Sequence, residues 1–359
     1  MDDIKELLII GNGFDLSVGL KTTYKDFFTR RYSEEVLKEV SDFKESQEVE
    51  IIKLKKLHDV NFWDIFFIIQ YLDDWNINKS WANIEVEIKD LVTESKKSNK
   101  FRKNQINFNG NSLTFLKTGK INNEKLANLL LEKCGIAINV AINEFLFTEL
   151  NKFEFNFSQY IGYLVYSDSS YDVKSRSLFN NLVESAETTF LLSFNYSELN
   201  LNNCWNIENV HGKSKQKIIF GIEHKDIDVG KKEYKFTKTY RKLLLNLSDN
   251  NHKSLPEKIE VIKFFGHSLA EADYSYFQSI FDFYSVYNTS INIEFFFNVF
   301  DEGQRDSIIE TQLQAVTNLF NVYGSTMNNK DHGKNLVHKL MLENRIHITE
   351  VDNYGERKG

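Results

Sequence analysis

Apolar and polar positions along this chain predict strands near both ends and helices between them. The first apolar run covers residues 5–10 and leads directly into a glycine-containing turn. From Tyr24 to about Tyr166, apolar residues mostly recur at the 3.6-residue spacing of an amphipathic helix. We therefore expect one early strand followed by a long, mainly helical segment.

Two stripes in that segment predict individual helices. One follows Ser80, which is suited to cap a helix, and continues through Ile84 and Leu91. The other is predicted to run as one long helix over residues 126–145. Residues 95–122 are rich in Lys, Asn, Ser and Gly, which is typical of a mobile loop.

Strand patterns return after Thr188 and alternate with helical patterns. The predicted strands are 189–194, 207–210, 217–222, 259–265, 291–300 and 345–351, and the predicted helices are 234–247, 273–287, 304–323 and 333–342. Such alternation is typical of βαβ units and of a parallel sheet covered on both faces. The fold class we expect is α/β, a Rossmann-like parallel sheet with a large helical insertion after its first strand. Residues 1–30 and 181–359 would form the nucleotide-binding core, and residues 31–180 the mainly helical insertion.

Composition narrows the class of protein. The 359 residues are 42% hydrophobic and 14% aromatic, which excludes a disordered chain and predicts an aromatic core. The net charge of −7 argues against sequence-independent binding to nucleic acid.

The sequence shows no pattern of secretion, membrane insertion or metal binding, which predicts a cytoplasmic protein without a metal. Cys134 and Cys204 are the only cysteines, which suits a reducing compartment. The N-terminus has no signal-peptide pattern, and the most apolar stretch, residues 62–72, is too short to cross a membrane. The histidines show no spacing typical of a metal site, so we expect no metal.

Four polar motifs follow predicted strands. The first is Gly11-Asn12-Gly13-Phe14-Asp15, which resembles a nucleotide-binding turn but has Leu where a dinucleotide fingerprint needs its third glycine. Its glycines suit close approach to a phosphate, and the amides of Gly11 and Gly13 are candidates to hold it. Alone, such a pattern is also typical of an ordinary tight turn.

The other three motifs supply the candidate catalytic and binding groups. Asn195 suits a ribose hydroxyl or a water, or alternatively an Asx turn, and His211 suits a general base or the cap of a turn before Gly212. The fourth motif is a strand followed by Gly266, His267 and Ser268, which suits a phosphate or ribose.

Parallel strands share one carboxyl end, so we expect Gly13, Asn195, His211 and Ser268 around one pocket. Asp273 follows the last motif and is predicted either to meet the ligand or, preferentially, to cap its helix.

Together these residues resemble the bacteriophage abortive-infection AbiH family from Leu7 to about Phe300. The resemblance rests on Leu8-Ile9-Ile10-Gly11-Asn12-Gly13-Phe14-Asp15, Gly19-Leu20 with Tyr24 and Phe27, Trp81 with Glu85, Ser193-Phe194-Asn195-Tyr196, His211-Gly212 with Phe220-Gly221-Ile222, and Phe265-Gly266-His267-Ser268-Leu269 with Asp273-Tyr274. It implies a bacterial phage-defence protein, whose trigger would be derived from the phage and is not visible in the sequence.

A remoter resemblance is to sirtuin-like NAD-binding domains, some of which hydrolyse NAD in phage defence. It implies that Asn195 and His211 are the catalytic residues. Gly11, Asn12, Gly13, Asp15, Gly266, His267, Ser268 and Asp273 would bind NAD. This chain departs from the sirtuin pattern twice: Asp15 stands where a small hydroxyl residue is common, and Ser197 where sirtuins have an Asp.

Three functions follow as hypotheses. The first is an effector that binds NAD or a related nucleotide and hydrolyses its nicotinamide–ribose bond. The second is a sensor that binds the nucleotide without turnover. The third, which the acidic balance disfavours, is an effector directed at nucleic acid. NAD would be a substrate or ligand rather than a permanent cofactor, and a homo-oligomer is compatible with each hypothesis.

Overall fold

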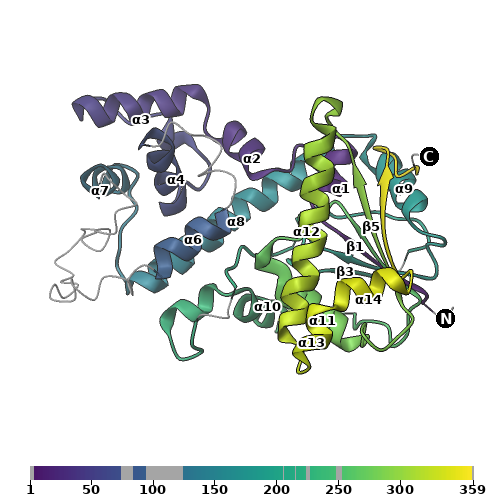
Figure 1. Ribbon diagram of the computed structural model, residues 1–359. Coiled ribbons are helices and arrows are strands. Elements are labelled where there is room, and N and C mark those ends of the chain that lie inside the picture. The colour runs from purple at the N-terminus through teal and green to yellow at the C-terminus, as the bar shows by residue number, and fades with distance from the viewer. Residues whose placement is uncertain are drawn as a thin grey trace. The chain divides into compact units, whose positions relative to one another are not determined.

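The computed structural model describes residues 4–73, 84–93, 124–204, 206–214, 216–223, 227–247 and 253–357 (Figure 1). The chain divides into two compact units. The sheet unit comprises Met1–Lys21, Gly162–Lys213 and Ser248–Gly359, and the helical unit comprises Thr22–Ile161 and Ser214–Leu247. Each unit is described below by itself.

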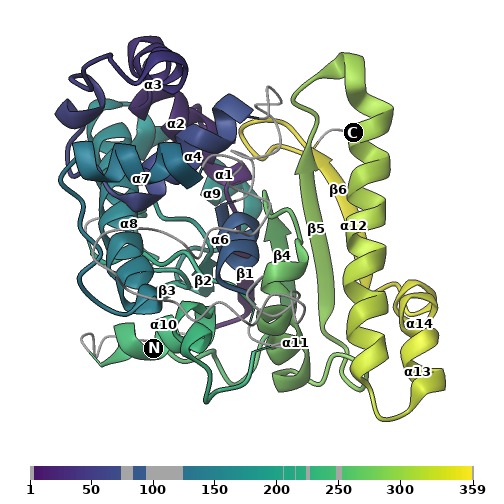
Figure 2. The same ribbon diagram turned by 90° about the vertical axis from the view of Figure 1, so that its left-hand side faces the viewer.

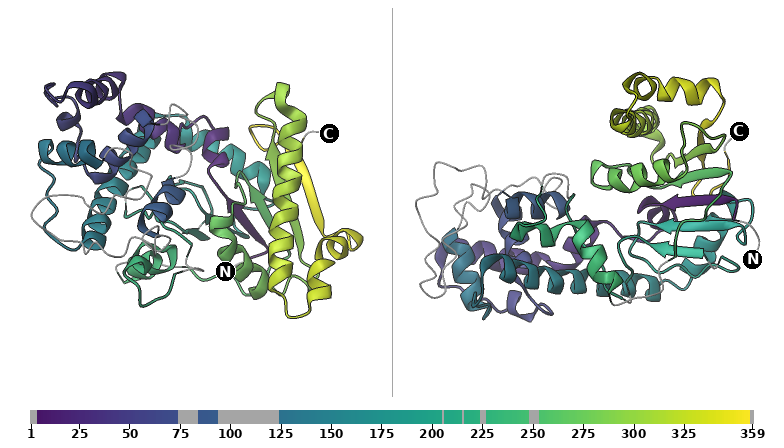
Figure 3. Two further views of the ribbon diagram at one scale, coloured as in Figure 1. Left: turned by 60° about the vertical axis from the view of Figure 1, so that its left-hand side comes forward. Right: turned by 90° about the horizontal axis from the view of Figure 1, so that it is seen from below.

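The sheet unit is built on one parallel sheet. Its strands are β1 (Glu6–Ile10), β2 (Thr189–Ser193), β3 (Asn206–Asn209), β4 (Val261–Phe265), β5 (Asn292–Asn298) and β6 (Ile346–Val351). Figure 2 shows them in the order β3-β2-β1-β4-β5-β6, and every neighbouring pair is parallel. In Figure 3, right, the purple β1 lies between the teal strands β2 and β3 on one side and the green strands on the other. This is the Rossmann order, in which the chain reverses direction across the sheet between β1 and β4.

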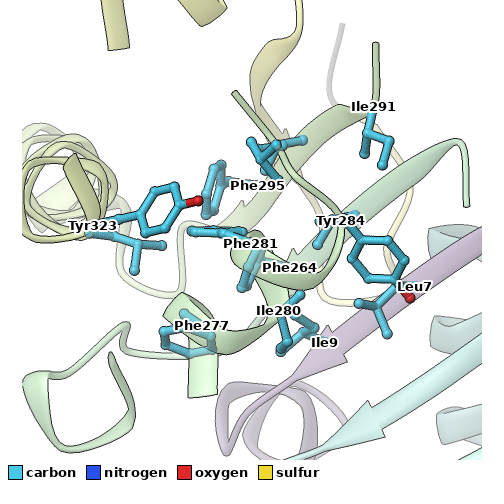
Figure 4. Packing of buried hydrophobic residues seen from close by; sticks show 14 of the residues in the cluster. Leu7, Ile9, Phe264, Phe277, Ile280, Phe281, Tyr284, Ile291, Phe295 and Tyr323 are labelled. Atoms are coloured by element: carbon cyan, nitrogen blue, oxygen red, sulfur yellow. The ribbon is translucent and has the colours of Figure 1, made fainter. Parts of the chain in front are cut away.

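The alternation of side chains along each strand fills two cores. Leu7 and Ile9 point into one of them, where Phe264 stacks on Phe295 with ring centroids 4.7 Å apart (Figure 4). Leu8 and Ile10 point into the other, on the opposite face of β1. Burial on both faces explains why β1 is a continuous apolar run in the sequence.

The helices are bounded as follows: α1 (Gly13–Ser17), α2 (Tyr24–Arg31), α3 (Glu34–Ser46), α4 (Phe62–Asp73), α6 (Ile84–Thr93), α7 (Glu124–Lys133), α8 (Ile142–Ser167), α9 (Tyr171–Leu182), α10 (Lys238–Asn246), α11 (Tyr274–Phe283), α12 (Arg305–Thr326), α13 (Lys330–Lys334) and α14 (Leu336–Leu342). Short 3₁₀ turns occupy Leu54–Lys56, Lys232–Phe236, Glu271–Asp273 and Glu302–Gln304. In the sheet unit, α11, α12 and α14 supply residues to the first core, and α1 and α9 to the second. None of the helices within the described ranges is long and apolar enough to span a membrane.

The helical unit is held by aromatic packing and by a buried ion pair. Phe27, Phe153 and Phe157 make ring contacts with one another or with neighbouring aromatic residues. Asp64, which is fully buried, accepts hydrogen bonds from Arg31 and from the hydroxyl of Tyr32. A buried carboxylate needs such partners to stay charged.

The predicted fold class is confirmed. The sheet is parallel throughout, and between β1 and β2 the described residues form helices and no strand. The predicted domain boundaries at residues 30 and 181 stay a prediction. The loop assigned to residues 95–122 and the cap at Ser80 lie outside the described residues.

One predicted strand is wrong. Residues 217–222 form no strand. Ile218 and Ile222 are isolated bridge residues, and Ile222 pairs with Thr237. The segment belongs to the helical unit, where the amide of Phe220 donates a 2.7 Å hydrogen bond to Glu154 on α8. Ile219 and Phe220 are fully buried there, and burial among helices gives the same short apolar run as burial in a sheet.

The helix predicted over residues 126–145 is two helices. α7 ends at Lys133, and Gly135 then adopts a left-handed φ of +71°. The amide of Gly135 donates to Glu132 and that of Ile136 donates to Leu131, which is the Schellman pattern of a helix end. The apolar stripe continues through Cys134 because both sides of the break are packed, so periodicity alone does not reveal it.

Candidate functional site

The turns after β1 and β4 pack directly against each other at the carboxyl edge of the sheet. The amide of Gly13 donates to the carbonyl of Gly266 at 2.7 Å, and that of Gly11 donates to Phe265 at 3.1 Å. A Cβ at Gly266 would lie 2.4 Å from the Phe14 nitrogen, and Gly266 has a φ of +65°. Only glycine fits such an approach.

This contact changes the predicted role of the first turn. The Gly11 and Gly13 amides, which the sequence interpretation assigned to a phosphate, already donate within the protein. α1, which follows them, has only five residues. The glycines thus explain how two strand ends meet at the point where the sheet order reverses, which is where this fold binds ligands.

Asp15 lies in a polar group on the first turn of α1. Its Oδ1 accepts hydrogen bonds from the hydroxyl of Tyr171 at 2.8 Å and from Ser197 at 3.0 Å. Burial raises the pKa of Asp15 to about 6, against the lowering effect of Ser197, Tyr171 and Asn195. We call Asp15, Tyr171 and Ser197 the aspartate–hydroxyl group.

Asn195 follows β2 and is only 2% exposed. Its side chain lies near enough to Asp15 for a polar contact that lowers the pKa of that carboxyl. The contact falls short of hydrogen-bond geometry, so neither Oδ1 nor Nδ2 is satisfied by a residue in the described ranges. Ser193 accepts the Asn195 amide hydrogen, and Asn209 donates to the Asn195 carbonyl, so the backbone is held in place. The Asx turn considered for this residue is therefore not formed.

His211 and His267 meet the carboxylate of Asp273 from two different strand ends. His211 Nε2 lies 3.3 Å from Oδ1, and His267 Nε2 lies 3.5 Å from Oδ2. The two histidine side chains are each 5% exposed, and that of Asp273 is 13% exposed. We call these three residues the histidine–aspartate group.

Asp273 does not cap its helix in the way the sequence suggested. It occupies the N-cap position of α11, but its side chain makes no capping hydrogen bond. The carboxylate is instead directed to the two histidines, so its position at the helix start serves the strand ends. Polar side chains at a helix start are frequent whether or not they cap, which is why sequence favoured the ordinary role.

Aromatic rings fix the orientation of the two histidines. Phe194, the residue before Asn195, makes edge contacts with His211 at 5.4 Å and with His267 at 4.7 Å between ring centroids. Tyr276 and Phe277 on α11 add further contacts, to His211 and His267 respectively. These ring contacts hold both imidazoles in a fixed orientation.

A strained residue orients His267. Leu269 has a φ of +51°, uncommon for a residue other than glycine, and its amide donates a 2.9 Å hydrogen bond to His267 Nδ1. Strain of this kind persists only where the surrounding contacts enforce it, and it is frequent at functional sites.

The structure therefore brings most predicted residues to the carboxyl edge of one sheet, in two groups. Asp15 is part of the aspartate–hydroxyl group, and Asn195 lies near it and lowers the pKa of its carboxyl. His211 and His267 meet at Asp273. Asn12 and Ser268 are exposed and lie in the turns after β1 and β4. That all of them line a single pocket stays a prediction.

The sequence interpretation missed the role of three residues in this site. Tyr171 comes from α9, in the stretch assigned to the helical insertion, and no motif marks it. The one sequence signal was general: a chain rich in buried tyrosine needs partners for its hydroxyls. Phe194 and Tyr276 carry no distinguishing pattern, because a core aromatic residue and a ring that orients a histidine read alike.

The family resemblance also includes Glu85 and Trp81. Glu85, in the helical unit, accepts the Gly221 amide and pairs with Lys238 at 3.0 Å, while Trp81 lies outside the described residues. No group of three or more potential ligands that could hold a metal ion occurs among the residues that the structure describes.

The fold and this edge define a Rossmann-like α/β protein with a buried polar site at the reversal point of its sheet. Residues 7–295 match the model of the bacteriophage abortive infection AbiH family, so the chain belongs to that family. Membership supports a role in abortive infection by bacteriophage. No match was found among curated proteins or among solved structures.

Proposed function

We propose that this protein is an abortive-infection effector that binds NAD or a related nucleotide and hydrolyses its nicotinamide–ribose bond. The observation that carries the proposal is the amide of Asn195, which is buried without a hydrogen-bond partner in the described parts of the chain. Leaving such a group unsatisfied costs about 1–3 kcal/mol. A native fold tolerates that cost where a ligand or an ordered water completes the bonds.

The chemistry of Asn195 suits a sugar. Its amide offers a donor and an acceptor side by side, which matches a ribose diol, or a ribose hydroxyl and the attacking water. Nicotinamide leaves readily, so the reaction needs a positioned water and a base more than a strong acid. His211, on the neighbouring strand end, is the candidate base that takes the proton.

Asp15 and Ser197 supply a second argument. These are the two positions at which the chain departs from the sirtuin pattern, with an Asp in place of a hydroxyl residue and a Ser in place of an Asp. They form a hydrogen bond with each other at 3.0 Å. By the remoter resemblance, the two departures exchange a carboxylate and a hydroxyl between positions that are in hydrogen-bond contact in this chain.

The proposal gives the pyrophosphate no contact with the Gly11 and Gly13 amides, because these already donate to the turn after β4. The ribose-binding role of Asn195 does not depend on them. In this proposal the glycines act by letting the two turns approach, which brings the ends of β1 and β4 together.

The test measures NAD in phage-infected cells that the protein protects, because an effector that is inactive at rest gives no answer in isolation. We expect NAD to fall with the wild type and to stay level with Asn195→Ala combined with His211→Ala. Asn298→Ala is the matched control: this strand-end amide is already satisfied by Ser17 and Asn353.

Two outcomes would contradict the proposal. Equal NAD loss with the wild type and the double variant would refute the catalytic assignment. Protection without any fall in NAD would refute hydrolysis and favour a sensor that binds without turnover, which mass spectrometry of copurifying nucleotides would then identify.

A further inference from the structure

We propose that Asp273 is a positioning residue that fixes both neighbouring histidines as their Nε2–H tautomers, so that Nδ1 is the proton-accepting nitrogen of His211. The inference starts from the placement of one carboxylate between two imidazoles, with a different oxygen towards each Nε2. The tautomers follow from this geometry alone. Their consequence for catalysis rests on the proposed function.

The tautomer of His267 is set by the backbone. The Leu269 amide donates to Nδ1 at 2.9 Å, so Nδ1 must present a lone pair. A neutral His267 then carries its only ring proton on Nε2, which faces Asp273 Oδ2 at 3.5 Å. The same bond opposes metal binding through Nε2, because a metal-bound histidine donates its other ring N–H rather than accepting there.

The tautomer of His211 is set by the remaining carboxylate oxygen. An ionised carboxylate only accepts hydrogen bonds, and Oδ1 lies 3.3 Å from His211 Nε2. A neutral His211 therefore has its proton on Nε2 and its lone pair on Nδ1. The rings of Phe194 and Tyr276 pack against His211 and hold it in this orientation.

Replacing Asp273 by Asn gives a selective prediction. An amide keeps one acceptor but turns the other oxygen into an N–H donor. His267 cannot accept at Nε2 without losing the Leu269 bond, so the amide oxygen must face His267 and the amide nitrogen must face His211. His211 then accepts at Nε2, moves its proton to Nδ1, and loses the lone pair there.

The experiment reads tautomers directly in the full-length protein with ¹⁵N-labelled histidine, by two-bond ¹H–¹⁵N NMR spectra at a pH at which the rings are neutral. His211→Gln and His267→Gln assign the two spin systems. We expect Nε2–H at both rings in the wild type, and in Asp273→Asn a change to Nδ1–H at His211 only. Asp282→Asn, a change of the same kind on α11, should leave both patterns as in the wild type.

Any other result at His211 would overturn the inference. An Nδ1–H or doubly protonated His211 in the wild type would do so, as would an identical pattern in the wild type and Asp273→Asn. This readout needs no activity, so it stands or fails separately from NAD hydrolysis. Circular dichroism of each variant confirms that the fold is intact; if Asp273→Asn does not fold, the wild-type spectrum alone decides.

A second experiment measures the rate of NAD hydrolysis by the Asp273 variants, under conditions in which the wild type hydrolyses NAD. We expect Asp273→Asn to lower kcat by a factor on the order of 100 or more with KM nearly unchanged, because a wrong tautomer removes the base and not the binding contacts. Asp273→Glu, which keeps a carboxylate, should recover part of kcat. A parallel change in KM would instead indicate a role in binding and contradict the positioning role.

Discussion

The two ends of the same sheet bury polar side chains in different ways. At the amino end, Glu6 on β1 lies 3.2 Å from Lys263 on β4 and accepts from the Glu184 amide and, at 3.5 Å, from Thr189. At the carboxyl end, Asn195 is equally buried, but both polar atoms of its amide lack a partner within the described ranges. The contrast separates a completed hydrogen-bond network, which stabilises the fold, from an incomplete one, which we propose a ligand completes.

The close approach of two backbone turns is a further feature of the carboxyl end, where a Cβ at Gly13 or Gly266 would collide with the facing turn. Residues with a positive φ, in contrast, occur at both ends. Leu269 is one at the carboxyl end, and the segments that lead into β3, β5 and β6 at the amino end contain Asn203, Ser285 and Asn344. The buried amide of Asn195, rather than strain, therefore distinguishes the two ends.

The largest effect we expect is on stability at the amino end. Lys263→Met leaves the buried carboxylate of Glu6 without its cation, which should lower the free energy of unfolding by about 3–5 kcal/mol. Burial already raises the pKa of Glu6, and Lys263 opposes that rise. Urea unfolding measures the loss.

Its control is the double change Glu6→Gln with Lys263→Met, which removes both charges and should recover most of the stability. A loss below about 1 kcal/mol in the single variant, or no recovery in the double one, would show that the amino-end pair is not the stabilising network described.

The next effect is on function at the carboxyl end. Asn195→Ala should cost about a hundredfold in rate or in nucleotide affinity, while the free energy of unfolding changes by less than about 1 kcal/mol. The side-chain amide completes no hydrogen bond to a described residue, so its removal leaves no buried polar partner unsatisfied. Thr189→Val, the matched change at the amino end, should reverse the pattern, with a loss of stability and unchanged binding.

Titration calorimetry with NAD and urea unfolding of the same two variants provide the comparison. If Asn195→Ala destabilised the protein as much as Thr189→Val does, the two ends would not differ in the way proposed.

The parts of the fold that sequence predicted are those in which local pattern and tertiary packing agree. The central strands β1, β2 and β4 are almost entirely buried, so their apolar runs were visible within one or two residues of their bounds. The edge strands β3 and β6 are only half-buried over most of their length. The segment 217–222 has the same pattern but is buried among helices. Its error shows that an apolar run reports burial and not pairing.

The sequence could predict those site residues that directly follow strands, because the carboxyl ends of parallel strands lie at one edge of the sheet. Asn195, His211 and His267 were found because each follows a strand. Tyr171 was not, since its contact with Asp15 spans 156 positions and comes from a helix without a motif. The bridging role of Asp273 depends on where two other strands end, and no local pattern of its own sequence contains that information.

The smallest effect is a pH dependence of stability at Asp15, at the carboxyl end of the sheet. Burial raises its folded pKa from 3.8 to about 6, so between these values the folded state binds more protons than the unfolded state. Stability must then fall as pH rises, and this one group should remove about 1 kcal/mol between about pH 5 and about pH 7. Asp15→Asn, which cannot ionise, should lose that slope and unfold at higher urea than the wild type near neutral pH. Urea titrations of both proteins across this range measure the difference. An equal slope in the two would mean that Asp15 is ionised in the folded protein throughout, and that its hydroxyl partners, rather than burial, dominate its charge.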